Sequence, residues 1–150
     1  MQNGKIKQIW ELLNTVPDPE IPVISIVELG VVREIIFTDN LYTILITPTY
    51  SGCPAVKTFI DDIKTCLKKN GIDNFKLNLI YSPAWTTDWM SEKTKEKLNK
   101  YGIAPPSNTV NCPQCNSDNT QLISEFGSTA CKAMYKCSKC LEPFEFFKCI

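Results

Sequence analysis

Apolar residues recur at helical spacing in two segments of this chain. A third, more polar segment begins near Ser91 and ends before Gly102, as a helix would. In the first segment they line one face and end at "VPDPEIP", whose three prolines cannot continue a helix. Glycines end the second and third segments. The pattern therefore predicts three helices, over residues 5–16, 54–70 and 91–101.

Runs rich in β-branched and aromatic residues lie between these helices. "VVREIIF" and "YTILITP" are typical of two strands joined by a hairpin turn at Asp39–Asn40, and "FKLNLIY" of a third strand. Because a helix separates the second strand from the third, we expect these two to be parallel through a right-handed crossover. The fold class predicted is α/β (α+β), with a small three-stranded mixed sheet and helices.

The composition changes abruptly after the last helix. "GIAPPSNTVN" combines a helix stop with two prolines and polar residues, and cysteines crowd the chain beyond it. We place the boundary within Pro105–Asn111. This predicts an α/β domain of residues 1–106 and a cysteine-rich β module of residues 107–150.

The spacing of cysteines in this module is that of a four-thiolate zinc ribbon. "CPQC" and "CSKC" are 21 residues apart, and two residues between cysteines let both sulfurs face one tetrahedral ion. "QLISEF", "KAMYKC" and "PFEFF" are expected to form three strands, with the metal supplying the folding free energy that so small a core lacks. The predicted ligands of the metal, expected to be zinc, are Cys112, Cys115, Cys137 and Cys140.

Two features of the module leave alternatives open. Asn116 and Leu141 stand where zinc knuckles often carry glycine, and because leucine resists the left-handed conformation we expect a less regular second knuckle. Cys131 and Cys149 are additional thiols, which fit buried small residues, a redox pair or ligands of a second arrangement. Six thiolates in one module also keep an iron–sulfur centre as an alternative to zinc.

Cys53, in "SGCPA", is a candidate reactive thiol. Pro54 suits the first position of a helix, which predicts Cys53 at the helix cap, facing free N–H groups and the positive end of the helix dipole. Such a thiol tends toward thiolate and acts as a nucleophile or soft-metal ligand, although a buried cysteine that only fills space fits the pattern equally well. Cys66, in the middle of the same helix, is expected in the core.

Two further segments carry polar or aromatic candidates. Asp18 and Glu20 in "DPEIP" fit either a carboxylate site or a rigid turn that stops the helix, and the residues alone favour the turn. Trp85 and Trp89 flank Asp88, and we expect them to pack a strand-to-helix connection over the sheet.

Composition limits the chemistry that the chain can perform. The 150 residues include 16 bases, 16 acids and no histidine, which removes Cys–His and Ser–His pairs and histidine metal ligands. The balanced charge does not favour nucleic-acid binding. With neither a signal-peptide core nor an apolar run of membrane-spanning length, we expect a cytoplasmic protein, in which eight cysteines favour metal or redox chemistry over disulfides.

These motifs together resemble a known family. "DPEIPVISIVELGVVREI", "TPTYSGCPA" and "SPAWTTDWMSEKTKEKL" are similar to the domain of SufT-type and cytosolic iron–sulfur assembly factors. With the added tail "SEFGSTACKAMYKCSKCLEPFEFFKC", nearly the full chain resembles the PaaD (PaaJ) family, which are components of bacterial ring-1,2-phenylacetyl-CoA epoxidases.

The resemblance implies an accessory role in aerobic phenylacetate degradation, without catalysis of its own. The implied partners are the other epoxidase subunits, particularly the iron-containing ones, and neither nucleic acid nor membrane. The implied cargo is iron or an iron–sulfur cluster, held transiently. Carried over to this chain, the resemblance marks Cys53 as the reactive cysteine and Asp18, Glu20 and Pro22 as motif residues, while Glu28 stands where relatives often have aspartate.

Several functions compete at this point. The first is a cofactor-assembly factor that holds iron at Cys53, and the second is a structural or regulatory subunit that docks the epoxidase components through its ribbon. An independent thiol enzyme would lack a histidine base. A nucleic-acid-binding ribbon is disfavoured, because the tail has four acidic and four basic residues and therefore no net positive charge.

Overall fold

The computed structural model describes residues 2–50, 52 and 55–150, and the chain divides after Trp85 into two compact units. This division lies earlier than the boundary at 106/107 that composition predicts, because the third helix and a short strand after it belong with the cysteine-rich unit. Where the independently folding domains separate stays a prediction.

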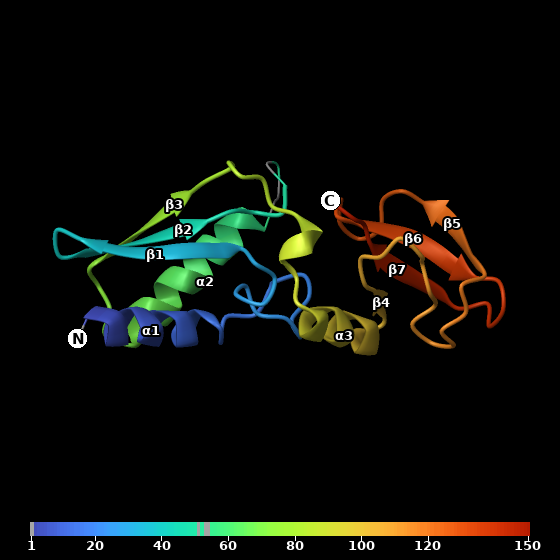
Figure 1. Ribbon diagram of the computed structural model, residues 1–150, viewed down its shortest axis with the longest axis horizontal. Helices are drawn as coiled ribbons and strands as arrows, with labels where there is room; N and C mark the ends of the chain where they lie inside the picture. The colour runs from blue at the N-terminus through green and yellow to red at the C-terminus, as the bar shows by residue number, and fades with distance from the viewer. Residues whose placement is uncertain (1, 51, 53–54) are drawn as a thin grey trace. The chain divides into compact units, whose positions relative to one another are not determined.

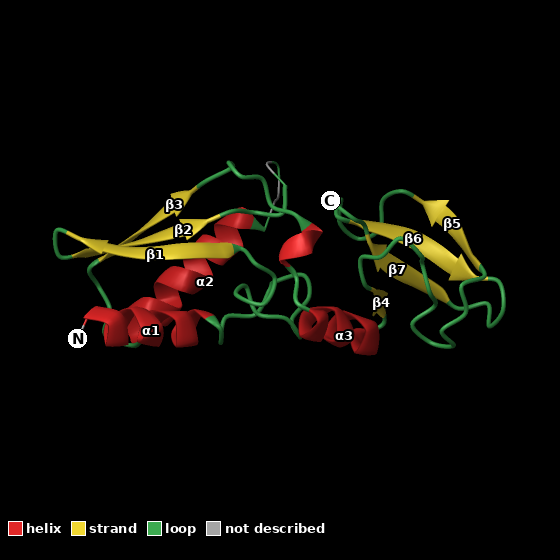
Figure 2. Cartoon of the chain, in the orientation of Figure 1, coloured by secondary structure: helices red, strands yellow, loops and turns green. Residues whose placement is uncertain are grey.

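The first unit is a three-stranded mixed sheet with two helices over one face (Figures 1 and 2). The strand order is β1-β2-β3, with β1 antiparallel to β2 and β2 parallel to β3, which confirms the predicted crossover. The turn between β1 and β2 uses Asp39 and Asn40 at φ 52° and 62°, as a tight hairpin requires. The elements are α1 (Gln2–Leu13), β1 (Val32–Thr38), β2 (Leu41–Ile46), α2 (Val56–Lys69) and β3 (Phe75–Leu79).

The core of this unit lies between the helices and the sheet. The apolar face of α2 is buried along its length, and α1 adds its own apolar face beside it. β1 and β2 contribute further buried apolar residues, among them Val32, Ile35 and Tyr42. Side chains that are at most 2% exposed include Ile9, Leu13, Ile44, Ile46, Phe59, Ile63 and Leu67.

The start of α2 differs from the prediction. The helix begins at Val56, and Ala55 is its N-cap residue, without a side-chain capping bond. The sequence placed the start two residues earlier, because Pro54 suits a first helical position. Cys53 and Pro54 lie outside the described residues, so the predicted placement of Cys53 at the helix cap rests on sequence alone.

The second unit is a four-stranded sheet preceded by a helix. Its strand order is β4-β7-β6-β5, in which β5, β6 and β7 are the three predicted strands and pair antiparallel. α3 has Ser91 as N-cap and Gly102, at φ 98°, as C-cap, as predicted from the glycine. The elements are the 3-10 helix η1 (Thr87–Trp89), α3 (Glu92–Tyr101), β4 (Ile103–Ala104), β5 (Thr120–Ser124), β6 (Lys132–Cys137) and β7 (Pro143–Phe147).

Strand β4 was not predicted, because its segment was interpreted as a linker. Ile103 and Ala104 are buried and pair in parallel with Glu145 and Phe146 of β7. A residue before proline is pushed toward extended backbone, and Ala104 precedes Pro105. The proline that signals a linker therefore also favours this short strand.

Candidate metal centre

The two cysteine knuckles have matching backbone geometry. The Asn116 N–H donates to the Cys112 carbonyl at 2.8 Å, and the Leu141 N–H donates to the Cys137 carbonyl at 3.0 Å. Each knuckle also donates a backbone N–H to its own first sulfur at 3.4 Å, from Gln114 in one and Cys140 in the other. The two loops share the bond to the first cysteine's carbonyl, differ in which N–H contacts the first sulfur, and both turn their cysteines toward a common point.

The knuckles bring the four predicted thiols together. Their Sγ atoms all lie within 4.8 Å of one another, with the closest pairs at 3.5 Å and 3.7 Å. A tetrahedral zinc ion with Zn–S bonds of about 2.3 Å places its sulfurs about 3.8 Å apart. The cluster therefore fits a four-thiolate metal ion. The thiols are Cys112, Cys115, Cys137 and Cys140.

The second knuckle is as regular as the first, which corrects the expectation from Leu141. Leu141 has φ 67° and Asn116 has φ 62°, so both occupy the left-handed region at equivalent positions. For leucine this conformation costs about 1–2 kcal/mol, and closure of the knuckle must offset it. The Leu141 side chain is 64% exposed.

The pKa values of Cys137 and Cys140 are shifted in opposite directions within the metal-free cluster. The backbone N–H of Cys140 donates to Sγ of Cys137 and, with smaller contributions from neighbouring groups, lowers the pKa of Cys137 to about 6. A backbone hydrogen bond at Glu142 lowers the pKa of Cys140, but desolvation and the other thiols outweigh it and raise that pKa to about 12. Of these two thiols, Cys137 is therefore the more readily deprotonated before a metal binds, and metal binding must displace the proton of Cys140.

Metal affinity should fall as the pH falls. The metal-bound cluster carries no thiol protons, whereas the free cluster takes up protons on acidification, so each displaced proton weakens binding about tenfold per pH unit. Below pH about 6, protonation of Cys137 should steepen this decline by one further proton. Competition titrations of zinc against a chromophoric chelator between pH 5 and 8 measure the slope. A slope that flattens below pH 6 would contradict the assignment.

Cys131 and Cys149 do not join the cluster and are not brought together. Cys131 is buried, with its sulfur 3.0 Å from the Thr129 hydroxyl, whereas Cys149 is exposed and contacts the carbonyl of Ser107. The Lys148 N–H donates to the Cys131 carbonyl, which joins the segment before Cys149 to Cys131. A role for these two thiols stays a prediction.

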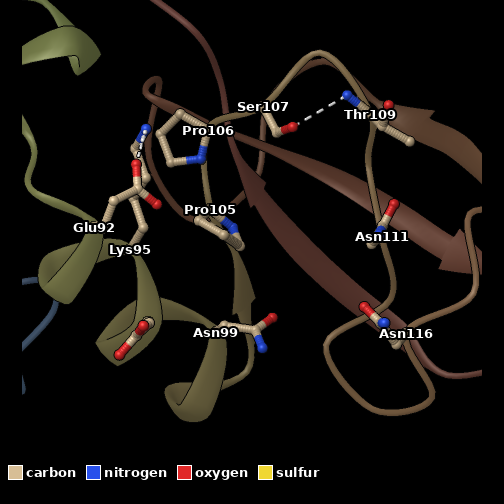
Figure 3. Close-up of a pocket in the computed structure, with 10 residues that line it drawn as sticks. Glu92, Lys95, Asn99, Pro105, Pro106, Ser107, Thr109, Asn111 and Asn116 are labelled. Atoms are coloured by element: carbon tan, nitrogen blue, oxygen red, sulfur yellow. Dashed lines mark hydrogen bonds and ion pairs between the residues drawn. The ribbon is translucent and has the colours of Figure 1, made fainter.

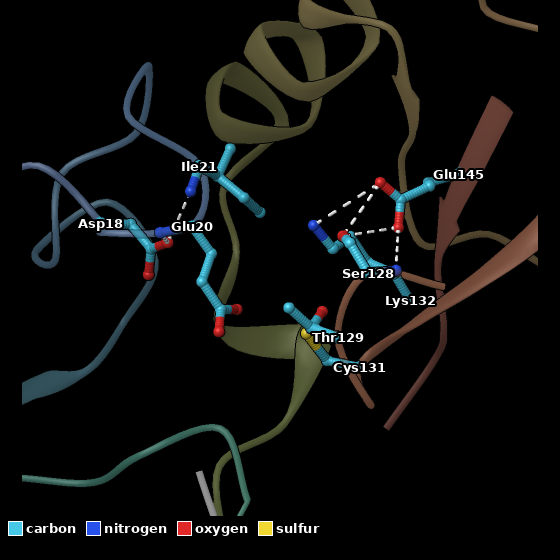
Figure 4. Close-up of polar contacts among 8 residues, drawn as sticks. All are labelled: Asp18, Glu20, Ile21, Ser128, Thr129, Cys131, Lys132 and Glu145. Carbon is cyan, nitrogen blue, oxygen red and sulfur yellow. Dashed lines mark hydrogen bonds and ion pairs between the residues drawn. The ribbon is translucent and has the colours of Figure 1, made fainter. Parts of the chain in front are cut away.

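Glu145 organises the loop before β6, a role that sequence reasoning missed. Its carboxylate accepts hydrogen bonds from the Ser128 N–H and hydroxyl, both at 2.8 Å, and pairs with the buried Lys132 at 3.9 Å (Figure 4). A Cβ atom on Gly127 would collide with this carboxylate. The Glu145 side chain on β7 thus accounts for the choice of glycine, serine and lysine at their positions in "FGSTACK".

In the first unit, "DPEIP" forms a rigid turn. One carboxylate oxygen of Asp18 accepts the backbone N–H groups of Glu20 and Ile21, each at 2.8 Å, and Asp18 is only 4% exposed (Figure 4). The Asp18 N–H in turn donates to the Ile24 carbonyl. This geometry is the turn that the residues alone favoured, and Glu20 is positioned by it.

Glu28 also has a defined local role. Its carboxylate accepts the Ser25 N–H at 3.2 Å, while the Ser25 hydroxyl accepts the Glu28 N–H at 3.0 Å and donates to the Asn14 side chain. This reciprocal pair has the form of a capping box. The pair accounts for glutamate at this position without a metal.

Three further side chains are placed in the first unit. Cys66 is half-buried, and its thiol donates to the Leu12 carbonyl at 3.5 Å, which links α2 to α1. The Trp85 indole N–H donates to a backbone carbonyl and the ring is buried, as expected for packing. The Thr47 hydroxyl, in the loop leading to Cys53, is buried without a hydrogen-bond partner among the described residues.

A cavity of about 460 Å³ lies in the second unit, between α3 and residues 105–116 (Figure 3). Glu92, Lys95 and Asn99 are among the residues that line it from the helix, and two prolines and four polar residues line it from the other side. No thiol lines this cavity. The cavity borders the first knuckle through Asn111 and Asn116 without including a metal-ligating side chain.

Comparison with known proteins identifies the family. Residues 6–72 match the family described as "Iron-sulfur cluster assembly protein", and residues 99–148 match the "PaaD zinc beta ribbon domain". A protein of Escherichia coli K12 that is named as a subunit of 1,2-phenylacetyl-CoA epoxidase is 48% identical over 155 residues, covering 97% of this chain and 94% of that protein. The chain belongs to the PaaD family. The resemblance stated from the motifs is thereby confirmed.

Two further similar proteins match less than two thirds of this chain. A Fe-S protein maturation auxiliary factor of Porphyromonas gingivalis is 33% identical over 94 residues, covering 61% of this chain and 89% of that protein. The crystal structure of a domain of unknown function from Bacillus anthracis superposes on this chain with a TM-score of 0.59 and 28% sequence identity. The match covers 64% of this chain and 92% of the Bacillus anthracis chain. These matches support the mixed α+β fold.

Within the described ranges, no helix of this PaaD family member is long and apolar enough to cross a membrane.

Proposed function

We propose that this chain is an accessory subunit of a phenylacetyl-CoA epoxidase that assists maturation of iron or iron–sulfur cofactors in the complex. The observation that carries the proposal is the union, in one chain, of an iron–sulfur-assembly unit with a PaaD-type ribbon. The near full-length similarity to the Escherichia coli protein supports the epoxidase as the client. The partners are then the other subunits of that complex.

The iron-handling residue in this proposal is Cys53. It follows Gly52 and lies two residues before the N-cap of α2, six residues after Thr47, whose buried hydroxyl has no hydrogen-bond partner among the described residues. A buried polar group without a partner is expected where a bound group completes the site. Cys53 would hold iron as cargo, with Glu20 on the rigid "DPEIP" turn as a second candidate contact.

The ribbon has a different part in the proposal. Four thiolates at tetrahedral spacing leave a bound zinc ion no open position, so the metal there stabilises the fold and performs no chemistry. This closed geometry also favours a second candidate function, in which the chain is a structural subunit that docks the epoxidase components through the ribbon and transfers no metal.

Omission of this chain tests the proposal. The remaining epoxidase subunits are co-expressed with and without it, in Escherichia coli lacking its own PaaD protein, and the purified complex is assayed for iron per mole and for epoxidation. We expect the complex formed without it to contain about tenfold less iron, as for loss of a metal-site determinant. Equal iron in both complexes, with activity lost only on omission, would favour the docking function instead.

A further inference from the structure

Strand β5 is an open edge of the ribbon sheet. It is the terminal strand in the order β4-β7-β6-β5 and pairs only with β6 among the described residues. Leu122 is 47% exposed and Ile123 is 58% exposed. The strand sequence is "TQLIS", without the lysine or proline that usually protects a sheet edge, and its only protection is the bulge at Ile123.

The register shows which backbone groups this edge offers. The Ser138 N–H donates to the Asn119 carbonyl, and residues 120, 121 and 122 follow in register with 137, 136 and 135. Bonded and non-bonded pairs alternate in an antiparallel ladder, so Gln121 bonds to β6 whereas the N–H and C=O of Leu122 point to the free edge. An extended segment can therefore pair at Leu122.

Charges at the ends of the strand restrict what can pair there. Asp118 precedes β5 and Glu125 follows it, and neither carboxylate forms an ion pair among the described residues. Antiparallel pairing of two copies centred on residues 121–122 would bring Asp118 within about one position of the second copy's Glu125, at both ends. Parallel pairing would place each acid beside its own counterpart. Like charges opposed in this way are destabilising, so a second copy is a poor occupant.

We propose that β5 is a docking edge for an extended segment of a partner protein, apolar in its middle and carrying Lys or Arg at both ends. The segment adds a fifth strand to the ribbon sheet, its backbone pairs at Leu122, and its basic ends meet Asp118 and Glu125. This inference deepens the docking role of the ribbon and rests on that role. It is independent of whether Cys53 transfers iron.

Synthetic peptides test the edge directly on the zinc-loaded full chain. The probe is Lys-Thr-Val-Thr-Val-Thr-Lys, and its matched control has Glu at both ends. Amide NMR shifts should locate the first peptide at residues 120–123, with about tenfold tighter binding than the control. Equal binding of both peptides, binding elsewhere on the chain, or no binding overturns the proposal, and so does self-association of the chain through β5.

Two variants distinguish loss of peptide binding at the β5 edge from loss of the fold. Leu122→Pro removes an outward N–H and no bond to β6, so the chain should keep its zinc while its affinity for the basic peptide falls about tenfold. The double variant Asp118→Asn with Glu125→Gln should abolish the preference for basic over acidic ends. The control is the double variant Glu11→Gln with Glu34→Gln, which removes the same amount of charge from the first unit. It should retain the preference for basic over acidic peptide ends. Unchanged binding by Leu122→Pro overturns the proposal.

Discussion

Replacing Cys137 with serine is expected to abolish metal binding by the second unit and to unfold strands β5, β6 and β7. Cys137 is fully buried, lies 3.5 Å from the sulfur of Cys115, and belongs to a small core with Cys112, Phe144 and Phe146. Structural zinc contributes about 10 kcal/mol or more to folding in modules of this size. A core with so few buried side chains cannot replace that contribution.

Metal analysis and NMR spectra of the full chain measure this effect. Wild type should bind one equivalent of zinc, and Cys137→Ser should bind none and show collapsed amide dispersion for residues 112–150. The first unit is compact and has a buried core of its own, so we expect its amide signals to persist. The matched control is Cys131→Ser, which alters a buried thiol outside the cluster and should retain the metal. Loss of zinc in the control, or its retention in Cys137→Ser, would refute the four-thiolate site.

The elements that sequence predicted well are those with a local periodic signal. The apolar face of α2 and the β-branched and aromatic runs of β1 and β2 fix helix and strand without distant contacts, and the helix between β2 and β3 implies their parallel pairing. The metal cluster was equally predictable, because two residues between cysteines constrain both sulfurs locally.

Other features depend on contacts that no local pattern encodes. Strand β4 exists because β7, about 40 residues later, offers an edge to Ile103 and Ala104. Leu141 adopts a left-handed conformation that its own preference opposes, since closure of the knuckle requires it. The role of Glu145 was hidden because its partner Ser128 lies 17 residues away.

The candidate iron site is assigned mainly from the sequence, because Cys53 lies outside the described residues. The turn of Asp18 and the capping box of Glu28 explain two carboxylates in structural terms. Asp18 and Glu20 stay candidate contacts for iron beside Cys53, and of the three only Cys53 is a soft ligand suited to transfer. The assignment of Cys53 therefore decides between the two functions proposed for the chain.

Cys53→Ala, co-expressed with the other epoxidase subunits, should lower both the iron content and the epoxidation activity of the complex about tenfold or more, because loss of a metal-site residue weakens metal handling at least to that degree. The matched control is Cys66→Ala, which removes a half-buried thiol of the same unit that contacts α1 and should leave both values unchanged. If Cys53→Ala keeps iron and activity while deletion of residues 112–150 abolishes them, the chain docks the complex through its ribbon and transfers no metal. If Cys53→Ala loses both while still co-purifying with its partners, the thiol handles the iron, because docking alone would then be intact.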